Sequence, residues 1–501
     1  MSLSVVSLAA GLSFKLAIRP TTRTAVKACL CHYSTNEVIP STDHGTWSRK
    51  KTSRKKNQTL KFNEHLSWEE RLADAVTPLW RLNYNEQLEL KQRKQKDILL
   101  QLSDQISMRN SSQLTLASHS TINNSKLSFP LLPIKASPAT VGYRNKSSFS
   151  VNRGVDGNPK TVGFYVGTGK AGNIVCVNGD NLINMPEKHL LVARCYQNFI
   201  RLSPLEPCLL FHTGGHWRDI TVRTNTKGHT MAIVYFHPQS LTPEEIDFHK
   251  SALVEYFIRG PGVVCQLNSL YFQESSVTRC SHEESPYQLL HGCPHIYEEV
   301  LGFKFRISAD AFFQVNQGAA EVLYHTVREM CLPDGRIRER GGILLDLCCG
   351  TGAIGIAMSP RVDRVIGIEL IEQAVEDARH NAALNGVFNC EFLQGKAEVV
   401  LPQLIPQLSS ISRELTVVVN PARSGLHYRV VRALRNTPSV RRLVYISCKP
   451  EGEAMRNFKE LCCSPDPQKK LIGEEFSLRV AVPVDMFPQT PHCELVLLFE
   501  R

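Results

Sequence analysis

Hydrophobic and polar residues follow different patterns in the middle and in the last part of the chain. From residue 131 to residue 308, short apolar runs are separated by Gly, Asn and Pro. The stretch 217–236 alternates apolar and polar residues on both sides of a turn-like segment at 225–228, which is typical of a β-hairpin. This pattern predicts a β-rich α+β domain over residues 131–310.

After Gly341, short apolar runs alternate with longer amphipathic stretches. The runs are GILLDLCCG, RVIGIEL, LTVVVNP, RLVYISC and CELVLLF. Between them, residues 371–386 place apolar side chains on one helical face and reach a stop signal at Gly386. Such alternation predicts a parallel sheet covered on both faces, with ligands at the carboxyl ends of its strands. We therefore expect a C-terminal α/β catalytic domain over residues 311–501.

The first 40 residues have the composition of an organelle import signal. They contain no acidic residue before Glu37 but carry four basic residues, Lys15, Arg19, Arg23 and Lys27. A secretory signal fits less well, because the apolar run at 5–12 is short and no small-residue cleavage site follows it; a disordered tail is the other alternative. We expect a mitochondrial presequence over residues 1–40 and a location in the matrix. No stretch of the sequence is long and apolar enough to span a bilayer.

Residues 41–130 are predicted to form a basic linker and a helical segment. The run SRKKTSRKK at 48–56 indicates a solvated linker or, less often, a nucleic-acid-binding arm. Ser67 and Glu70 form a capping-box signature before a helical stretch at 72–100, which is interrupted near Pro78. A loop rich in Ser and Asn is expected at 111–128. The net charge of +11 permits an anionic partner without identifying one.

The glycine-rich run at 344–355 indicates an adenosine cofactor. Gly350 and Gly352 have the spacing of a strand-to-helix turn that a ribose approaches closely. Glu369 ends the next apolar run, 23 positions after Asp346 (369 minus 346), where a carboxylate accepts hydrogen bonds from ribose hydroxyls. These features suit a dinucleotide and S-adenosylmethionine equally. A dehydrogenase would need a second catalytic domain, whereas here two later strand ends carry reactive groups, which favours S-adenosylmethionine.

Those reactive groups are Cys448 and Glu494. Cys448 ends an apolar run and precedes Lys449, which favours a thiolate, although a lone cysteine in a strand is more often structural. Glu494 begins an apolar run. Burying an ionised carboxylate costs much free energy, so we expect Glu494 either to pair with another group or to take part in the reaction. The sixteen cysteines show no C-x-x-C pair and no Cys/His cluster at zinc-ligand spacing, so we expect reduced thiols and no metal site.

Several motifs in a fixed order resemble the RNA uracil-C5 methyltransferases, which make 5-methyluridine in transfer and ribosomal RNA, and most of all the animal mitochondrial members. The motifs are FFQVN at 312–316, LLDLCCGTGAIG at 344–355, Glu369, NPARSGL at 420–426, SCKP at 447–450 and DMFPQTPHCE at 485–494. The resemblance covers roughly residues 143–501. It implies a Rossmann-like, S-adenosylmethionine-dependent methyltransferase domain at the C-terminus, preceded by the β-rich domain.

The resemblance also implies roles for single residues. Gln314, Glu369 and Asn420 are expected to hold S-adenosylmethionine, with the backbone around Gly350 and Gly352 under its methionine part. Cys448 is expected to be the nucleophile and Glu494 the general base. Arg423 is expected either to contact the substrate or to hold its own loop by a salt bridge.

Two features depart from the family pattern. Asn420 stands where the family usually has Asp, so a role that needs the negative charge is in doubt. The cysteine spacing of the iron-sulfur cluster found in bacterial ribosomal RNA members is missing, and no such cluster is expected.

The sequence therefore predicts a monomeric mitochondrial enzyme that binds RNA, and neither DNA nor membranes. We expect it to form 5-methyluridine through a covalent Cys–C6 adduct, at the T-loop uridine of transfer RNA and in small-subunit ribosomal RNA. Two alternatives are a methyltransferase with another acceptor, such as a protein, and a non-catalytic RNA-binding or folding factor that keeps the fold. The first would not need the Cys448 and Glu494 pair.

Overall fold

The computed structural model describes residues 65–111, 127–167, 174–209, 214–276, 285–331, 342–412 and 414–501. The predicted presequence, the basic run at 48–56 and most of the Ser- and Asn-rich stretch lie outside these residues. The domain limits placed after residues 130 and 310 stay predictions.

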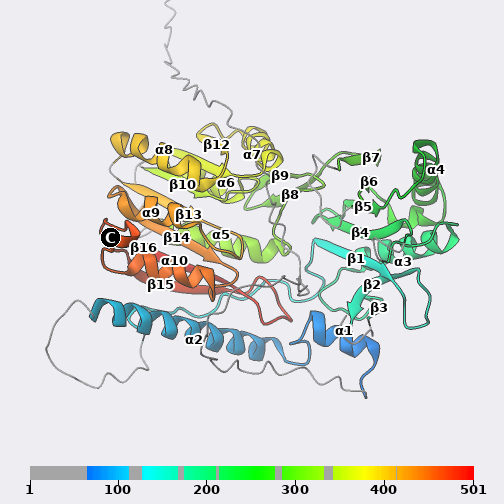
Figure 1. The fold of residues 1–501 in the computed structure, drawn as a ribbon, viewed down its shortest axis with the longest axis horizontal. Coiled ribbons are helices and arrows are strands. Elements are labelled where there is room, and N and C mark those ends of the chain that lie inside the picture. Colours follow the sequence, from blue (N-terminus) through cyan, green and yellow to red (C-terminus); the bar gives the residue numbers. More distant parts are fainter. Residues whose placement is uncertain are drawn as a thin grey trace, which may run out of the picture. The chain divides into compact units, whose positions relative to one another are not determined.

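The β-rich domain is built on a mixed sheet in the order β3-β2-β1-β4-β5-β6-β7 (Figure 1). Its strands pair antiparallel except for β5 and β6, which are parallel. The predicted hairpin is confirmed, because β4 and β5 pair antiparallel around the 225–229 turn. Strand bounds are β1 (Lys146–Asn152), β2 (Thr161–Val166), β3 (Val175–Val177), β4 (Trp217–Thr224), β5 (Thr230–Phe236), β6 (Ser269–Glu274) and β7 (Tyr287–Gly292).

One face of this sheet packs on helices α3 (Glu187–Leu202) and α4 (Pro243–Val254), with η2 (Glu255–Arg259) and η3 (Pro261–Cys265) continuing from α4. The other face carries a second set of side chains, among them Met231, Ile233 and Tyr271. These residues share a hydrophobic cluster with the hairpin of β8 (Ile296–Val300) and β9 (Phe303–Ile307) and with α5 (Gln317–Cys331). The chain therefore passes from the β-rich domain into the catalytic domain through a continuous core.

The catalytic domain has the order β12-β11-β10-β13-β14-β16-β15 (Figure 1). The first five strands of this order pair in parallel. Along β10, Leu344 faces the cluster that contains α5, α6 and α7, and Leu345 faces the cluster that contains α8, α9 and α10. Helices thus cover both faces, and the expected Rossmann-like α/β class is confirmed.

The strands and helices of this domain have the following bounds: β10 (Ile343–Leu347), α6 (Ala353–Met358), η5 (Ser359–Arg361), β11 (Arg364–Glu369), α7 (Glu372–Leu384), β12 (Cys390–Gln394), α8 (Ala397–Ile411), β13 (Leu415–Val419), α9 (Tyr428–Asn436), β14 (Val440–Ser447), α10 (Glu453–Cys462), η6 (Pro467–Lys469), β15 (Ser477–Val484) and β16 (Glu494–Glu500). The helix predicted at 371–386 is confirmed as α7, which stops before Gly386 at a φ of 64°.

The prediction of an all-parallel sheet was wrong at its end. The CELVLLF run forms β16, which pairs antiparallel with both β14 and β15. A short loop at 485–493 joins β15 to β16, and such a connection can only return the chain antiparallel to the strand it leaves. The sequence analysis did not identify β15, so β16 had been taken as one more strand entered through a helix.

The two N-terminal helices pack against different domains, the first against the β-rich domain and the second against the catalytic domain. The capping box is confirmed at α1 (Trp68–Val76), where the Ser67 hydroxyl accepts from the Glu70 backbone N–H and the Glu70 carboxylate accepts from the Ser67 N–H. The chain breaks near Pro78 as predicted and resumes as α2 (Tyr84–Ser111). Apolar residues of α2 join the core beside α8, α9 and α10.

A buried ion pair joins α2 to the loop that precedes β16. The Lys91 ammonium donates to the Asp485 carboxylate at 2.6 Å and to the Phe487 carbonyl at 3.0 Å, and both charged side chains are 0% exposed. The Tyr84 hydroxyl donates to the second oxygen of Asp485 at 3.1 Å. Gln87 and Gln489 exchange two hydrogen bonds, each of 2.8 Å. Each carboxylate oxygen of Asp485 therefore has a hydrogen-bond donor from α2.

Replacement of Lys91 by Met is expected to lower the free energy of unfolding by about 3–5 kcal/mol, because it leaves the Asp485 charge buried without its partner. Urea unfolding of the purified protein measures the loss. Asp485→Asn in the same chain should recover part of it, since the neutral amide no longer needs a counter-ion.

Lys94→Met is the matched control on the same helix. Lys94 lies 4.0 Å from Glu451, and both side chains are more than 40% exposed, so the loss should stay below about 1 kcal/mol. Equal losses for the two variants would show that the buried pair contributes no more than a surface charge.

Candidate active site

The sheet register brings Cys448 and Glu494 to the same end of two neighbouring strands. The last pair of the β14–β16 ladder is Ser447 opposite Leu495. Cys448 is the next residue after β14 and Glu494 is the first residue of β16, so the two follow that pair in register. Directly opposed residues on antiparallel strands have Cβ atoms about 4.5–5.5 Å apart. The two predicted reactive groups therefore lie at the same end of neighbouring strands, one position beyond the last paired residues.

Glu494 is a buried acid whose side chain lies at the carboxyl end of β14. Only 5% of the residue is exposed. Burial raises the pKa of Glu494 to about 7, because a carboxylate loses its hydration there, and the nearby Arg423 charge partly opposes this effect. Near neutral pH the group is therefore divided between its acid and base forms, which suits a proton acceptor.

Cys448 is partly buried at the end of β14. Its strand neighbour Tyr445 is fully buried and donates a hydrogen bond from its hydroxyl to Asn457 at 2.9 Å. Asn457 also binds the backbone of Leu426 through two hydrogen bonds of 2.7 Å and 3.0 Å. The end of β14 is thereby tied to the NPARSGL loop.

Arg423 lies in that loop and is exposed. Its charge acts on two groups of the site, because it favours the ionised form of Glu494 and lowers the pKa of His492, a residue whose burial has the larger effect. Arg423 is thus placed toward the Glu494 end of the site rather than toward the glycine-rich loop.

The glycine-rich loop after β10 needs glycine at two positions. Gly350 and Gly352 have φ angles of 55° and 78°, in the left-handed region that disfavours a side chain. A Cβ on Gly352 would also lie 2.9 Å from the Phe392 ring, whereas a Cβ on Gly350 would meet no atom within 4 Å. Gly352 therefore packs against the protein, and Gly350 faces open space where a ligand has room to approach.

Glu369 closes this loop from the end of β11. Its carboxylate accepts from the backbone N–H of Gly350 at 3.0 Å, of Leu370 at 2.7 Å and of Ile371 at 3.1 Å. A carboxylate has about four acceptor positions, so it still has capacity for a hydroxyl. The predicted ribose acceptor thus lies within hydrogen-bond distance of the predicted floor of the cofactor site.

Asp346, which received no role from the sequence, is buried beneath the loop. One oxygen accepts from the Gly355 N–H at 2.9 Å, and the other is buried with no hydrogen-bond partner. Burial raises its pKa to about 7, against the effect of the Gly355 hydrogen bond. Burial raises the pKa of Tyr324 on α5, and the nearby charges of Asp346 and Glu494 raise it further. The loop and the Cys448–Glu494 pair therefore share one neighbourhood.

Asn420 lies beside this neighbourhood, whereas the contact of Gln314 is with the segment before β1. The Asn420 N–H donates to the Leu347 carbonyl at 3.2 Å, which places it beside the start of the glycine-rich loop. Gln314 is 7% exposed, and its carbonyl accepts from the Asn145 side chain at 2.8 Å. The open side of Gly350, the Glu369 carboxylate and the unpaired Asp346 oxygen fit an adenosine cofactor with a cationic end.

Sequence reasoning missed Tyr84, Gln87 and Lys91, which hold the loop before Glu494 and lie outside the resembling region. The signal was weak: polar residues four positions apart on a charged helix are usually solvated. In the described part of the chain, no group of His, Cys, Asp or Glu has the arrangement of a metal site. None of the described helices has the length and hydropathy of a membrane span.

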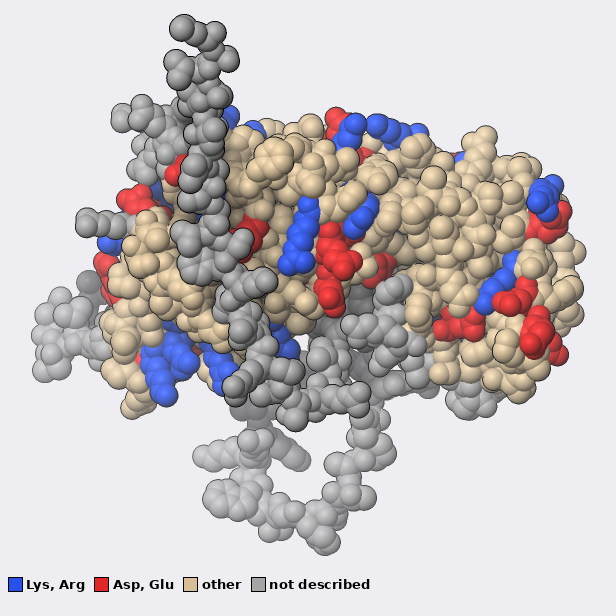
Figure 2. Space-filling model, turned by 90° about the horizontal axis from the view of Figure 1, so that it is seen from above, with Lys and Arg blue, Asp and Glu red and all other residues tan. Residues whose placement is uncertain are grey.

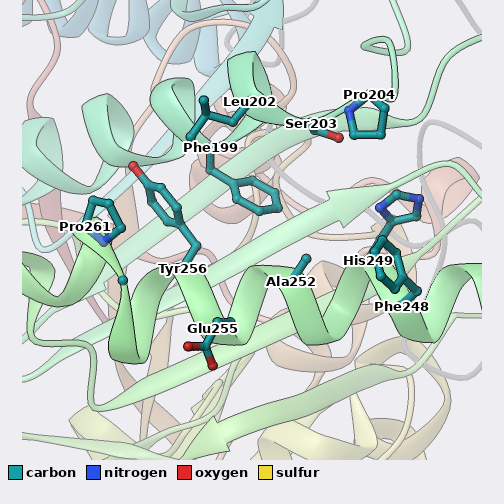
Figure 3. Close-up of a pocket in the computed structure, with 11 residues that line it drawn as sticks. Phe199, Leu202, Ser203, Pro204, Phe248, His249, Ala252, Glu255, Tyr256 and Pro261 are labelled. Carbon is teal, nitrogen blue, oxygen red and sulfur yellow. The ribbon is translucent and has the colours of Figure 1, made fainter.

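The β-rich domain has an apolar hollow of its own, with a volume of about 440 Å³. Figure 3 shows Phe199 and Tyr256 along it, with Phe248 and His249 at the other end. It is lined by α3, α4 and the segments that follow them and contains none of the predicted site residues. The hollow is therefore separate from the Cys448 and Glu494 site.

Comparisons with known proteins identify the family of the chain. A family model described as tRNA (Uracil-5-)-methyltransferase matches residues 300–501. The chain is 66% identical over 451 residues to a tRNA (uracil-5-)-methyltransferase homolog B from Danio rerio, covering 90% of this chain and 91% of that protein. It is 58% identical to the human homolog B, with 87% and 84% covered, and 43% identical to the mouse homolog A, with 86% and 69% covered.

A solved structure shares the fold. The Pyrococcus abyssi tRNA (uracil-54, C5)-methyltransferase in complex with S-adenosyl-L-homocysteine has a TM-score of 0.56 and 22% identity, and 84% of each chain is covered. At this identity the likeness concerns the fold alone. The identities to the curated relatives extend over most of both chains and include the β-rich domain. On this evidence the chain belongs to the S-adenosylmethionine-dependent tRNA (uracil-5-)-methyltransferase family.

Proposed function

We propose that this protein methylates C5 of a uridine in transfer RNA through a covalent adduct on Cys448. The observation that supports the proposal is the register of β14 and β16, which brings Cys448 and Glu494 to the same end of neighbouring strands. Methyl transfer to nitrogen or oxygen needs no such pair, because those acceptors are already nucleophilic. The names of the relatives, tRNA (uracil-5-)-methyltransferases, support the same reaction.

The first step belongs to Cys448. Uracil C5 is too weakly nucleophilic to react unaided. The Cys448 thiolate forms a bond to C6, and the electron pair of the C5–C6 double bond moves into the ring to give an enolate whose C5 is nucleophilic. S-adenosylmethionine, when bound by Glu369, Gln314 and Asn420 over the glycine-rich loop, supplies an electrophilic methyl group for C5.

The last step belongs to Glu494. After C5 has taken a methyl group it still carries its hydrogen, and the adduct stays linked to the protein. The Glu494 carboxylate accepts that proton, the C–H electron pair restores the C5–C6 double bond, and the C6–S bond breaks with its electrons returning to sulfur. The Arg423 charge favours the carboxylate form that this step needs.

We further propose the T-loop uridine as the target, by analogy with the Pyrococcus enzyme described as acting at uracil-54, and small-subunit ribosomal RNA as a second substrate. A base in a folded loop must rotate out of its stack to reach Cys448, at a cost of about a few kcal/mol. The composition of residues 1–40 supports a mitochondrial matrix location for both reactions.

Cys448→Ala is expected to abolish methyl transfer to unmodified transfer RNA and to prevent a covalent complex with RNA that contains 5-fluorouridine. Fluorine at C5 blocks the final elimination, so the wild-type adduct should persist on a denaturing gel. Cys293→Ala removes an exposed cysteine of the β-rich domain and should keep both properties. A wild-type protein that binds RNA but forms neither product nor adduct would favour the non-catalytic alternative that Asn420 leaves open.

Glu494→Gln is expected to stall the reaction after methyl transfer, so that a Cys448-linked, methylated RNA accumulates. In the wild-type protein the release step should become faster as pH rises through about 7, since only the ionised carboxylate accepts the proton. Rapid-quench measurement of adduct and product between pH 6 and pH 8.5 separates the two steps. Rapid release of product by Glu494→Gln would exclude Glu494 as the base.

The same variant should change stability with a defined sign. Because the folded-state pKa of Glu494 lies above its usual value, folding takes up a proton, and stability falls as pH rises from about 4.5 to about 7. Glu494→Gln removes this dependence and should be more stable than the wild-type protein above pH 7. Thermal unfolding of both proteins at pH 5 and pH 8 provides the comparison. If the variant gains less stability over the wild-type protein at pH 8 than at pH 5, the raised pKa of Glu494 is contradicted.

Residues 1–40 fused to a fluorescent protein are expected to direct it into mitochondria. The matched fusion with Arg19→Glu and Arg23→Glu should remain outside, because import depends on the positive face of the signal. Equal distribution of the two fusions would reject the proposed location.

A further inference from the structure

Two cationic side chains lie opposite each other on the sheet of the β-rich domain. Lys146 on β1 lies directly opposite Arg223 on β4 in the antiparallel register. Like charges in this position repel each other and destabilise a sheet. Arg144 lies close by, with its Nε donating to the Lys146 carbonyl at 3.2 Å. Charge of one sign is thus concentrated where two strands meet.

The nearby carboxylates Asp310 and Asp377 offset this charge only in part, because the pKa values of Lys146 and Arg223 are still lowered. Arg223 is 3% exposed, it donates one hydrogen bond to the Ala311 carbonyl, and its Nε is buried without a hydrogen-bond partner. Three described charges act on Lys146. Arg223 and Arg144 disfavour its protonated form, and Asp310 favours it. An unpaired guanidinium N–H inside a protein costs free energy that a bound acceptor would recover.

The cation pair is attached to the segment that carries Gln314. Arg223 binds the Ala311 carbonyl, and Asn145, between Arg144 and Lys146, binds the Gln314 carbonyl through its side chain and the Val315 carbonyl through its N–H, each at 2.8 Å. Asn316 at the end of this segment donates to the Met486 carbonyl at 3.3 Å, in the loop that leads to Glu494. The cations and the catalytic loop are therefore held by one stretch of chain.

We propose that Lys146, Arg223 and Arg144 form a phosphate site that holds the RNA backbone next to the target uridine. A phosphodiester supplies the acceptor that the Arg223 Nε lacks and a negative charge between the opposed cations. The proposal rests on the proposed function for its ligand. On the face drawn in Figure 2, basic and acidic residues are interspersed over most of the described surface.

The electrostatics of the free protein agree with a site prepared for an anion. Repulsion by Arg223, followed by burial and by Arg144, lowers the pKa of Lys146 to about 7. A bound phosphate would favour the charged form and draw a proton onto Lys146.

The test compares Lys146→Gln with the wild-type full-length protein in binding to unmodified transfer RNA over a range of salt. Lys146→Gln should bind about tenfold more weakly, the size of one charge-assisted hydrogen bond, with a salt slope smaller by about one. Its thermal stability should be unchanged or higher, since the opposed charge is gone. Arg259→Gln, which removes an equal charge from an exposed ion pair in the same domain, should leave RNA affinity unchanged.

Calorimetric measurement of S-adenosylhomocysteine binding shows whether the three cations bind RNA or the cofactor. It should be equal in Lys146→Gln and in the wild-type protein, and a loss of this binding would assign the cations to the cofactor and overturn the proposal. A wild-type protein that methylates transfer RNA while Lys146→Gln matches it in affinity and salt slope would overturn the phosphate site alone. A wild-type protein that neither binds nor methylates the RNA would overturn the proposed function as well.

Discussion

The antiparallel pairing of β16 with β14 is the constraint on which the candidate site depends. Strand side chains alternate between faces, so a slip of one residue would move Glu494 to the opposite side of the sheet from its present neighbour Cys448. The register is held by apolar residues of β16, such as Leu495 and Leu497, which must enter the core beside α8, α9 and α10. Core packing therefore fixes the distance between the two reactive groups.

The loop that delivers Glu494 is fixed from outside the catalytic domain. Lys91 and Tyr84 on α2 bind Asp485, the first residue of the loop, and Tyr143 donates to the Pro488 carbonyl at 3.0 Å. Two buried charges cost hydration that their attraction only partly returns, so this contact contributes a defined geometry more than stability. Helix α2 therefore helps to position Glu494, although it lies outside the residues that the family model matches.

The sequence predicted what local patterns encode. Alternating apolar runs identified the β4–β5 hairpin and α7, and the glycine positions identified the loop at Gly350 and Gly352, because backbone conformation at those residues depends on their own chemistry. It failed where the determinant is distant. The direction of β16 depends on β15, and Lys91 meets Asp485 across 394 positions of sequence. Nothing in a charged helix of ordinary composition reveals such a partner, whereas the resemblance predicted a joint role for Cys448 and Glu494, which lie at the same end of neighbouring strands.

The molecule has two groups of unfavourably placed charges, and each group has the sign that one of the two proposed ligands would compensate. Asp346 and Glu494 are buried carboxylates with little compensation, near the glycine-rich loop and the end of β14. Lys146 and Arg223 are opposed cations on the neighbouring sheet. Each arrangement costs stability in the free protein and is relieved by charge of the opposite sign. The methyl donor of the proposed reaction carries a sulfonium cation and its RNA substrate carries phosphates, so binding both would recover what folding alone leaves unpaired.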